Sequence, residues 1–90
     1  PIWRGGAHDE DRLLRDAYTN SLTLARQHDL LTIAFPSIST GAYGYPVDEA
    51  SPIALKTVVE FLGTPTSIES VRFVLFDRLT FQAYERALGA

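Results

Sequence analysis

Hydrophobic residues recur at helical spacing along three segments of this sequence, and two short, mostly apolar runs separate the segments. The first periodic segment, residues 9–29, places on one face Leu14, Ala17, Ser21, Leu24 and Ala25. Glu10 and Asp11 near its start and Arg26 near its end complement the helix dipole. We therefore predict a first amphipathic helix over these residues.

The second periodic segment predicts another amphipathic helix, which ends at Gly63 and Pro65. Its core face consists of Ala54, Val58, Phe61 and Leu62. Ser51 is favoured as the N-cap, with Pro52 in the first helical position, where a missing N–H costs little. A start near Asp48 would place Pro52 just past the first turn and cost a hydrogen bond.

Two apolar runs and one further periodic segment complete the pattern. Residues 31–35 lack polar alternation, as expected for a strand buried on both faces, and residues 71–76 predict a second buried strand. Residues 78–88 predict a last helix, with Gly89 past its end. One side of this helix carries Phe81, Tyr84 and Leu88.

The predicted order is helix, strand, loop, helix, strand, helix, which is typical of an α/β fold. A crossover of about 35 residues between the strands predicts a parallel, right-handed unit. Ninety residues, 46% of them hydrophobic and 21% charged, form one globular domain at most. Two strands with helices on both faces leave sheet edges exposed, so we expect an incomplete α/β sandwich, completed by an absent half or by another chain.

Composition narrows the chemistry of these residues. The net charge of −3 gives no diffuse positive field for nucleic acid or anionic membrane, and no apolar run reaches the roughly 18 residues of a membrane span. The absence of Cys removes disulfides and thiolate chemistry and agrees with a cytoplasmic location. His8 and His28, the only histidines, stand apart from any catalytic or metal-ligand spacing, so we expect no metal site.

The segment PSISTGAYGYP, residues 36–46, joins a predicted strand to a predicted helix without a charged residue. In parallel α/β sheets ligands bind beyond the carboxyl ends of the strands, and helix N-termini favour anions. Gly41 and Gly44 allow positive φ and a close approach to a ligand. The N–H groups of residues 39–44 are therefore predicted to hold a phosphate or diphosphate, with the Tyr43 ring against a sugar or base; the alternative is a plain tight turn.

The stretch AFPSISTGAYGYP resembles the second ligand-binding loop of macro domains, which are ADP-ribose-binding modules. PIWRGG and EDRLLRDAYTNSL are similar to the segment and the helix that follow the family's third or fourth strand, and VRFVLFDRLTFQAYERAL to its last strand and helix. The nearest likeness is the bacterial-type branch, the O-acetyl-ADP-ribose deacetylases. The resemblance implies a three-layer α/β/α sandwich, of which residues 1–90 are the C-terminal portion without the N-terminal strands and the first ligand loop.

The resemblance also implies which residues bind the ligand. In the family, backbone N–H groups of this loop wrap the diphosphate, and its aromatic side chain lies by the distal ribose. The corresponding residues here are Ser39, Thr40, Gly41, Ala42, Tyr43 and Gly44. Phe76, near the end of the last strand, is the candidate for stacking on adenine, with ordinary core packing as the alternative. The family's catalytic Asp has no counterpart here, so we expect no catalytic residue in this chain.

The implied function is binding of ADP-ribose through the Gly-rich loop. In the full-length domain, the expected activity is hydrolysis of O-acyl-ADP-ribose or removal of ADP-ribose from proteins. The alternatives are a non-enzymatic reader of ADP-ribose and, against the net charge, an RNA- or poly(A)-binding module. Expected partners are ADP-ribose, O-acyl-ADP-ribose and ADP-ribosylated proteins, with no membrane, nucleic acid or cofactor.

Overall fold

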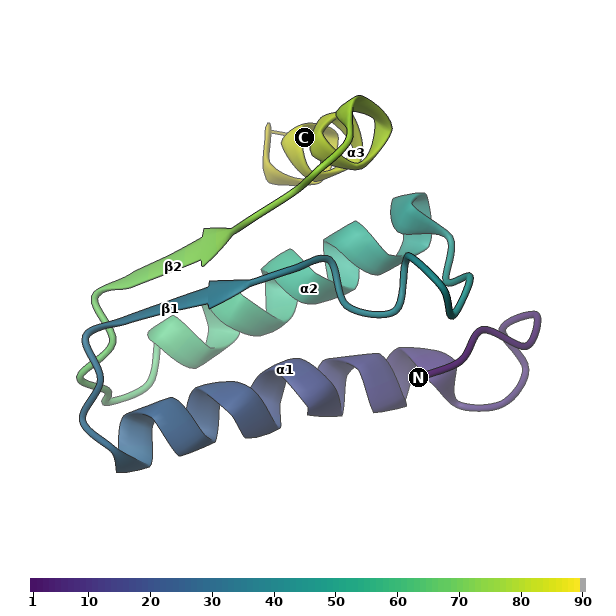
Figure 1. Ribbon diagram of the computed structural model, residues 1–90. Helices are drawn as coiled ribbons and strands as arrows, with labels where there is room; N and C mark the ends of the chain where they lie inside the picture. The colour runs from purple at the N-terminus through teal and green to yellow at the C-terminus, as the bar shows by residue number, and fades with distance from the viewer. Residues whose placement is uncertain (90) are drawn as a thin grey trace.

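Three helices and two strands alternate along the chain in the predicted order (Figure 1). The structure is a computed structural model and describes residues 1–89. Its elements are α1 (Glu10–Gln27), β1 (Thr32–Phe35), α2 (Val47–Leu62), β2 (Ser70–Phe73) and α3 (Arg78–Gly89). None of the helices in this part of the chain has the length and apolarity needed to cross a bilayer.

β1 and β2 form a parallel pair, in register over the four residues of each strand (Figure 1). The crossover through α2 therefore confirms the predicted parallel unit. β1 begins one residue later than predicted, and β2 ends at Phe73 instead of Phe76. β2 ends early because the chain beyond Phe35 turns toward α1, where the Ile38 N–H donates to Tyr18 Oη. Val74 N–H still donates to the Phe35 carbonyl at 2.8 Å, but the residues after it have no strand beside them within residues 1–89.

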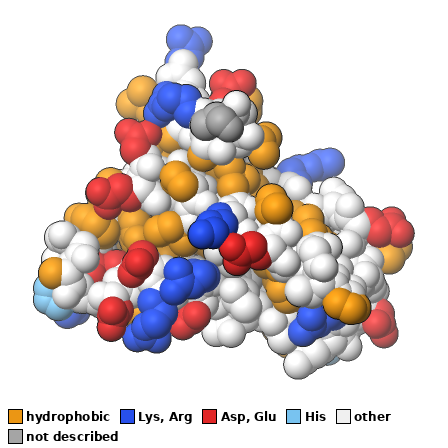
Figure 2. All heavy atoms as spheres, turned by 180° about the vertical axis from the view of Figure 1, so that it is seen from behind, with side chains coloured by type: hydrophobic (Ala, Val, Ile, Leu, Met, Phe, Trp, Pro, Cys, Tyr) orange, Lys and Arg blue, Asp and Glu red, His pale blue; other side chains and the backbone are white. Residues whose placement is uncertain are grey.

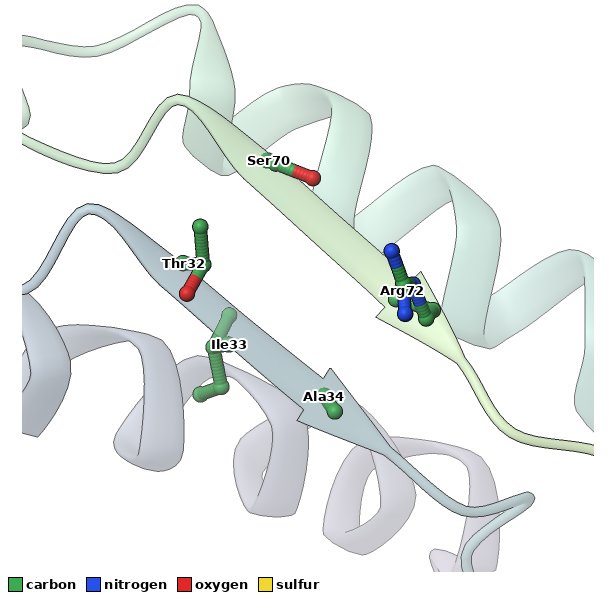
Figure 3. A pocket seen from close by; sticks show the side chains of 5 residues that line it. All are labelled: Thr32, Ile33, Ala34, Ser70 and Arg72. Atoms are coloured by element: carbon green, nitrogen blue, oxygen red, sulfur yellow. The ribbon is translucent and has the colours of Figure 1, made fainter.

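The helices cover one face of this sheet. Alternate strand residues pack with the buried cluster, namely Ile33, Phe35, Val71 and Phe73. The other face is open, and a hollow of about 250 Å³ there is lined mainly by Thr32, Ala34, Ser70 and Arg72 (Figure 3). The expectation that β1 is buried on both faces is wrong for the described residues, since Thr32 and Ala34 are exposed. The α/β fold class is confirmed, and the helices of residues 1–89 lie on one side of the sheet.

The buried stripe of α1 is displaced from the predicted one. Its core side chains are Leu14, Tyr18, Leu22 and Ala25, with Glu10 buried at its first position. Leu24, predicted to face the core, is 57% exposed. The stripe containing Tyr18 faces inward because it buries a large aromatic ring, whose centroid lies 4.9 Å from that of Phe35.

α2 begins at Val47, so the prediction that Ser51 caps it is wrong. The Pro46 carbonyl already accepts the first N–H groups of the helix, and Pro52 lies inside it. Ser51 is 1% exposed, and its Oγ donates to the Ala83 carbonyl of α3 at 3.4 Å. The hydroxyl that looked like a cap therefore joins two helices.

The predicted core faces of α2 and α3 are confirmed in part. Buried as predicted are Ala54, Val58, Phe61 and Tyr84. Predicted to be buried but exposed are Leu62, Phe81 and Leu88. Ala83 takes the missing core position of α3, because its carbonyl meets Ser51 and this side of the helix therefore faces α2. Gly89, predicted to lie past the end of α3, is its last residue.

Charged side chains of both signs are scattered over the face shown in Figure 2, with hydrophobic side chains between them. One exposed pair links two helices, since Arg86 of α3 lies 2.7 Å from Asp48 of α2. No single-sign field dominates this face, in agreement with the small net charge of −3.

Candidate functional site

The loop between β1 and α2 lies at the end of the two-stranded sheet where the carboxyl ends of the strands lie (Figure 1). Because the strands are parallel, the chain leaving β2 reaches the same end of the sheet. A pocket of about 180 Å³ there is lined by Thr40 and Gly41 from the loop and by Phe76, Asp77 and Thr80 from beyond β2. The structure therefore brings three predicted site residues, Thr40, Gly41 and Phe76, around one pocket.

The other predicted loop residues do not line this pocket. Ser39 is 9% exposed, has φ +67°, and carries a buried Oγ without a hydrogen-bond partner within residues 1–89. Ala42, Tyr43 and Gly44 are exposed on the adjoining turn. Of the predicted loop residues, Thr40 and Gly41 thus line the pocket, Ser39 is buried, and residues 42–44 are exposed beside them.

A tight turn sets the direction of the N–H groups in this loop. Gly44 N–H donates to the Gly41 carbonyl at 3.0 Å, and Tyr45 N–H donates to the Ser39 carbonyl at 2.9 Å. The N–H groups of residues 41–43 donate to no acceptor within the described chain. Successive unbonded N–H donors on a turn are suited to binding an anion.

The two loop glycines differ in what they contribute. Gly44 has φ +75°, a conformation that glycine adopts without strain. Gly41 does not have positive φ, so the expectation of positive φ is confirmed at Gly44 alone. A Cβ built on Gly41 would meet no atom within 4 Å. The chain's own packing therefore leaves the space in front of Gly41 open.

Two buried tyrosines support the start of the loop. Tyr18 Oη accepts the N–H of Ile38 at 3.1 Å, and Tyr84 Oη lies 2.9 Å from Ser37 Oγ. Tyr18 is 1% exposed, and burial together with the neighbouring Tyr84 raises the pKa of its phenol, which stays neutral. The helical pattern places both tyrosines on helix faces, but it gives no sign that their hydroxyls reach this loop.

Trp3 supports the end of the loop. Its backbone N–H donates to the Tyr43 carbonyl at 3.0 Å, and its ring centroid lies 4.7 Å from that of Tyr45. Tyr45 is 3% exposed and belongs to the core, and the partly buried Trp3 ring packs against it. The loop is therefore fixed on both sides of residues 41–43, whose N–H groups stay unbonded within the described chain.

Asp77 is the only carboxylate among the residues that line the pocket. It accepts the Thr80 N–H at 2.8 Å and the Thr80 hydroxyl at 3.0 Å, as an N-cap of α3. These bonds from Thr80 lower the pKa of Asp77. An Asp three residues before a Thr at a helix start is the sequence signal for this cap. No cluster of three or more potential metal ligands occurs among residues 1–89.

Curated relatives match almost all of this chain. A macro domain-containing protein of Caldanaerobacter subterraneus subsp. tengcongensis is 54% identical over 87 residues, which are 97% of this chain and 49% of the relative. The O-acetyl-ADP-ribose deacetylase of Escherichia coli is 50% identical over 88 residues, 98% of this chain and 50% of the relative. The chain thus spans about half the length of the curated relatives it matches.

Solved macrodomain structures superpose on the described fold. The Oceanobacillus iheyensis macrodomain with ADP matches with a TM-score of 0.91 and 40% identity, over 99% of this chain and 46% of that one. The Trypanosoma brucei macrodomain in complex with ADP-ribose matches with a TM-score of 0.84 and 34% identity, over 88% of this chain and 34% of that one. The similarity therefore extends over the helices, both strands and the loop.

The Macro domain family model matches residues 1–54, a range that contains α1, β1, the Gly-rich loop and the first half of α2. This range includes both the loop and the Trp3 segment that supports it. The relatives and the superposed structures extend the likeness to β2 and α3. On this evidence, the chain belongs to the macro domain family.

Proposed function

We propose that this chain carries the diphosphate-binding loop of a macro domain whose complete form binds ADP-ribose. The observation that carries the proposal is the set of unbonded N–H groups at residues 41–43, beside a pocket that Phe76 also lines. Phosphate oxygens are suited to such donors. The Phe76 side chain is 90% exposed and offers a ring face to adenine. The solved Trypanosoma brucei macrodomain in complex with ADP-ribose supports this choice of ligand.

We further propose that residues 1–90 are the C-terminal portion of this domain. Two observations support it: one face of the two-stranded sheet is open, and the matched relatives are about twice as long as this chain. Additional strands and helices would cover the open face and both sheet edges.

Hydrolysis of an ester at the distal ribose is the second part of the proposal. It is supported by the 50% identity with the Escherichia coli O-acetyl-ADP-ribose deacetylase. A fixed diphosphate would hold the ribose in place while water adds to the acyl carbon. The bond from that carbon to the ribose oxygen then breaks and the ribose oxygen takes up a proton, which releases ADP-ribose and the carboxylic acid. Asp77 already binds Thr80, so we assign the base to a residue outside this chain. Removal of ADP-ribose from proteins would use the same loop.

The alternative is a reader that binds ADP-ribose on modified proteins without chemistry. It is favoured by the lack of an unengaged carboxylate among the residues that line the pocket. An assay of acetate release from O-acetyl-ADP-ribose by the full-length protein separates the two. Release supports the hydrolase, whereas binding without release supports the reader.

Isothermal titration of the full-length protein with ADP-ribose tests the binding proposal. Gly41→Glu should weaken binding by roughly 100-fold or more, because it adds bulk and negative charge beside the N–H donors. Gly89→Glu is the matched control, since a Cβ at Gly89 also meets nothing within 4 Å but lies at the end of α3. Unchanged affinity in Gly41→Glu would show that this loop is not the diphosphate site.

The RNA-binding alternative has its own test. Binding of poly(A) with a strong salt dependence would favour it over ADP-ribose recognition.

A cytoplasmic location is expected from the lack of Cys, and imaging of a fluorescent fusion of the full-length protein checks it.

A further inference from the structure

The first residue of α1 is a buried carboxylate that is saturated with backbone donors. Glu10 is 2% exposed, and one of its oxygens accepts the N–H groups of Arg4 and Gly6, each at 2.8 Å. The other oxygen accepts the His8 N–H at 2.6 Å. Burial alone raises the pKa of Glu10, but the backbone N–H groups of Arg4, Gly6 and His8, together with its own, outweigh it and bring the pKa from 4.5 to about 2. The Glu10 side chain is therefore ionised, and its carboxylate binds the N–H groups of the preceding turn.

The turn that Glu10 closes has a shape only glycine permits. Gly5 has φ +90° and Gly6 has φ +88°. A Cβ on Gly6 would lie 3.0 Å from Cη2 of Trp3, so the indole ring packs directly on the backbone of this turn. The position of Trp3 is thus set by the same turn whose N–H groups Glu10 binds.

Trp3 connects this turn to the Gly-rich loop. Its N–H donates to the Tyr43 carbonyl at 3.0 Å, and its ring lies against Tyr45 with a centroid distance of 4.7 Å. Neither Trp3 nor Glu10 lines the pocket beside Phe76. Their influence on a ligand there would act only through the shape of the loop.

We propose that Glu10 is a positioning residue for the ligand loop: through the turn at residues 4–8 and Trp3, it fixes the Tyr43 carbonyl and with it the N–H groups of residues 41–43. The inference rests on the proposed binding of ADP-ribose at this loop. A carboxylate is needed because three N–H groups converge on two acceptor oxygens. Glutamine has one acceptor oxygen, and its NH₂ group would face a donor.

The test compares ADP-ribose affinity in the full-length wild type and in Glu10→Gln, each labelled with 5-fluorotryptophan. The Trp3 fluorine resonance is assigned by its absence in Trp3→Phe. We expect Glu10→Gln to weaken binding about tenfold and to shift or broaden the Trp3 resonance, while circular dichroism shows a folded protein. Glu60→Gln is the matched control, since the Glu60 side chain is 63% exposed on α2, and it should leave affinity and the Trp3 resonance unchanged.

The outcomes separate this inference from the proposed function. If the wild type binds no ADP-ribose, the proposed function fails, and this inference fails with it. If the wild type binds and folded Glu10→Gln binds equally well, only the positioning role is overturned; a merely structural role would lower the melting temperature and leave affinity unchanged. Where Glu10→Gln does not fold, Gly6→Ala replaces it, because alanine strains the turn at φ +88° and its Cβ lies 3.0 Å from the Trp3 ring, while the Glu10 carboxylate is retained. Wild-type affinity in folded Gly6→Ala also overturns the proposal.

Discussion

The two ends of the Gly-rich loop are held by different chemistry. At its start, the phenol hydroxyls of Tyr18 and Tyr84 reach Ile38 and Ser37 from two helices. At its end, Trp3 binds the loop, and behind it lies a turn closed by an anionic carboxylate. The start therefore depends on packing in the core, and the end depends on a charge that acid can remove. One loop thus combines a support insensitive to acid with one that responds to it.

Removing the aromatic support should have the largest effect on stability. Tyr18→Ala is expected to lower the free energy of unfolding by about 3–5 kcal/mol, because it empties a core position and leaves the Ile38 N–H without its partner. Urea denaturation of the full-length protein measures this. Tyr43→Ala is the matched control, since that ring is 55% exposed, and it should change stability by about 0.5 kcal/mol at most. Equal losses in the two variants would contradict a core role for Tyr18.

Removing the charged support should have a smaller effect, and one that depends on pH. The pKa of Glu10 in the folded protein is about 2, below its ordinary 4.5. Its stabilisation is therefore complete above about pH 4.5 and is lost as the pH falls toward 2. The difference in melting temperature between wild type and Glu10→Gln should narrow from about pH 5 to about pH 3. The difference in melting temperature between wild type and Tyr18→Phe should stay constant, since the Tyr18 phenol is neutral throughout. If the difference for Glu10→Gln were also independent of pH, the two supports of the loop would not differ in their response to acid.

The smallest effect is expected from the second tyrosine hydroxyl. Tyr84→Phe removes one buried hydrogen-bond partner of Ser37 Oγ and should cost about 1 kcal/mol of unfolding free energy. Tyr43→Phe, which removes the same atom from an exposed ring, should cost less. If the two variants are equally stable, the start of the loop is held by Tyr18 alone.

The fold was largely predictable, because periodicity and element order depend on local sequence. The parallel strand pair follows from the long crossover between two apolar runs. The start of α2 was not predictable, because Ser51 serves a contact with Ala83 instead of its own helix. The early end of β2 has a similar cause, since Tyr18 draws the chain after β1 toward α1. In each case a contact between distant residues overrides a local preference.

The candidate site was predictable at its centre and not at its supports. Thr40, Gly41 and Phe76 converge because parallel strands end at the same sheet edge, and their sequence positions imply this. Glu10 looks like an ordinary acidic residue at a helix start. Its role depends on how the preceding turn folds back, and neither spacing nor composition encodes that. The ADP-ribose contacts of these residues remain predictions.

The Tyr18–Tyr84 contact also bears on how the protein is made. Their hydroxyls lie 3.5 Å apart, although 66 positions separate them in the chain. Tyr84 is synthesised well after the Gly-rich loop, so a nascent chain contains the loop sequence before it contains both of its supports. We therefore expect the start of the loop to gain its contact with Tyr84 only once α3 has been synthesised and has docked.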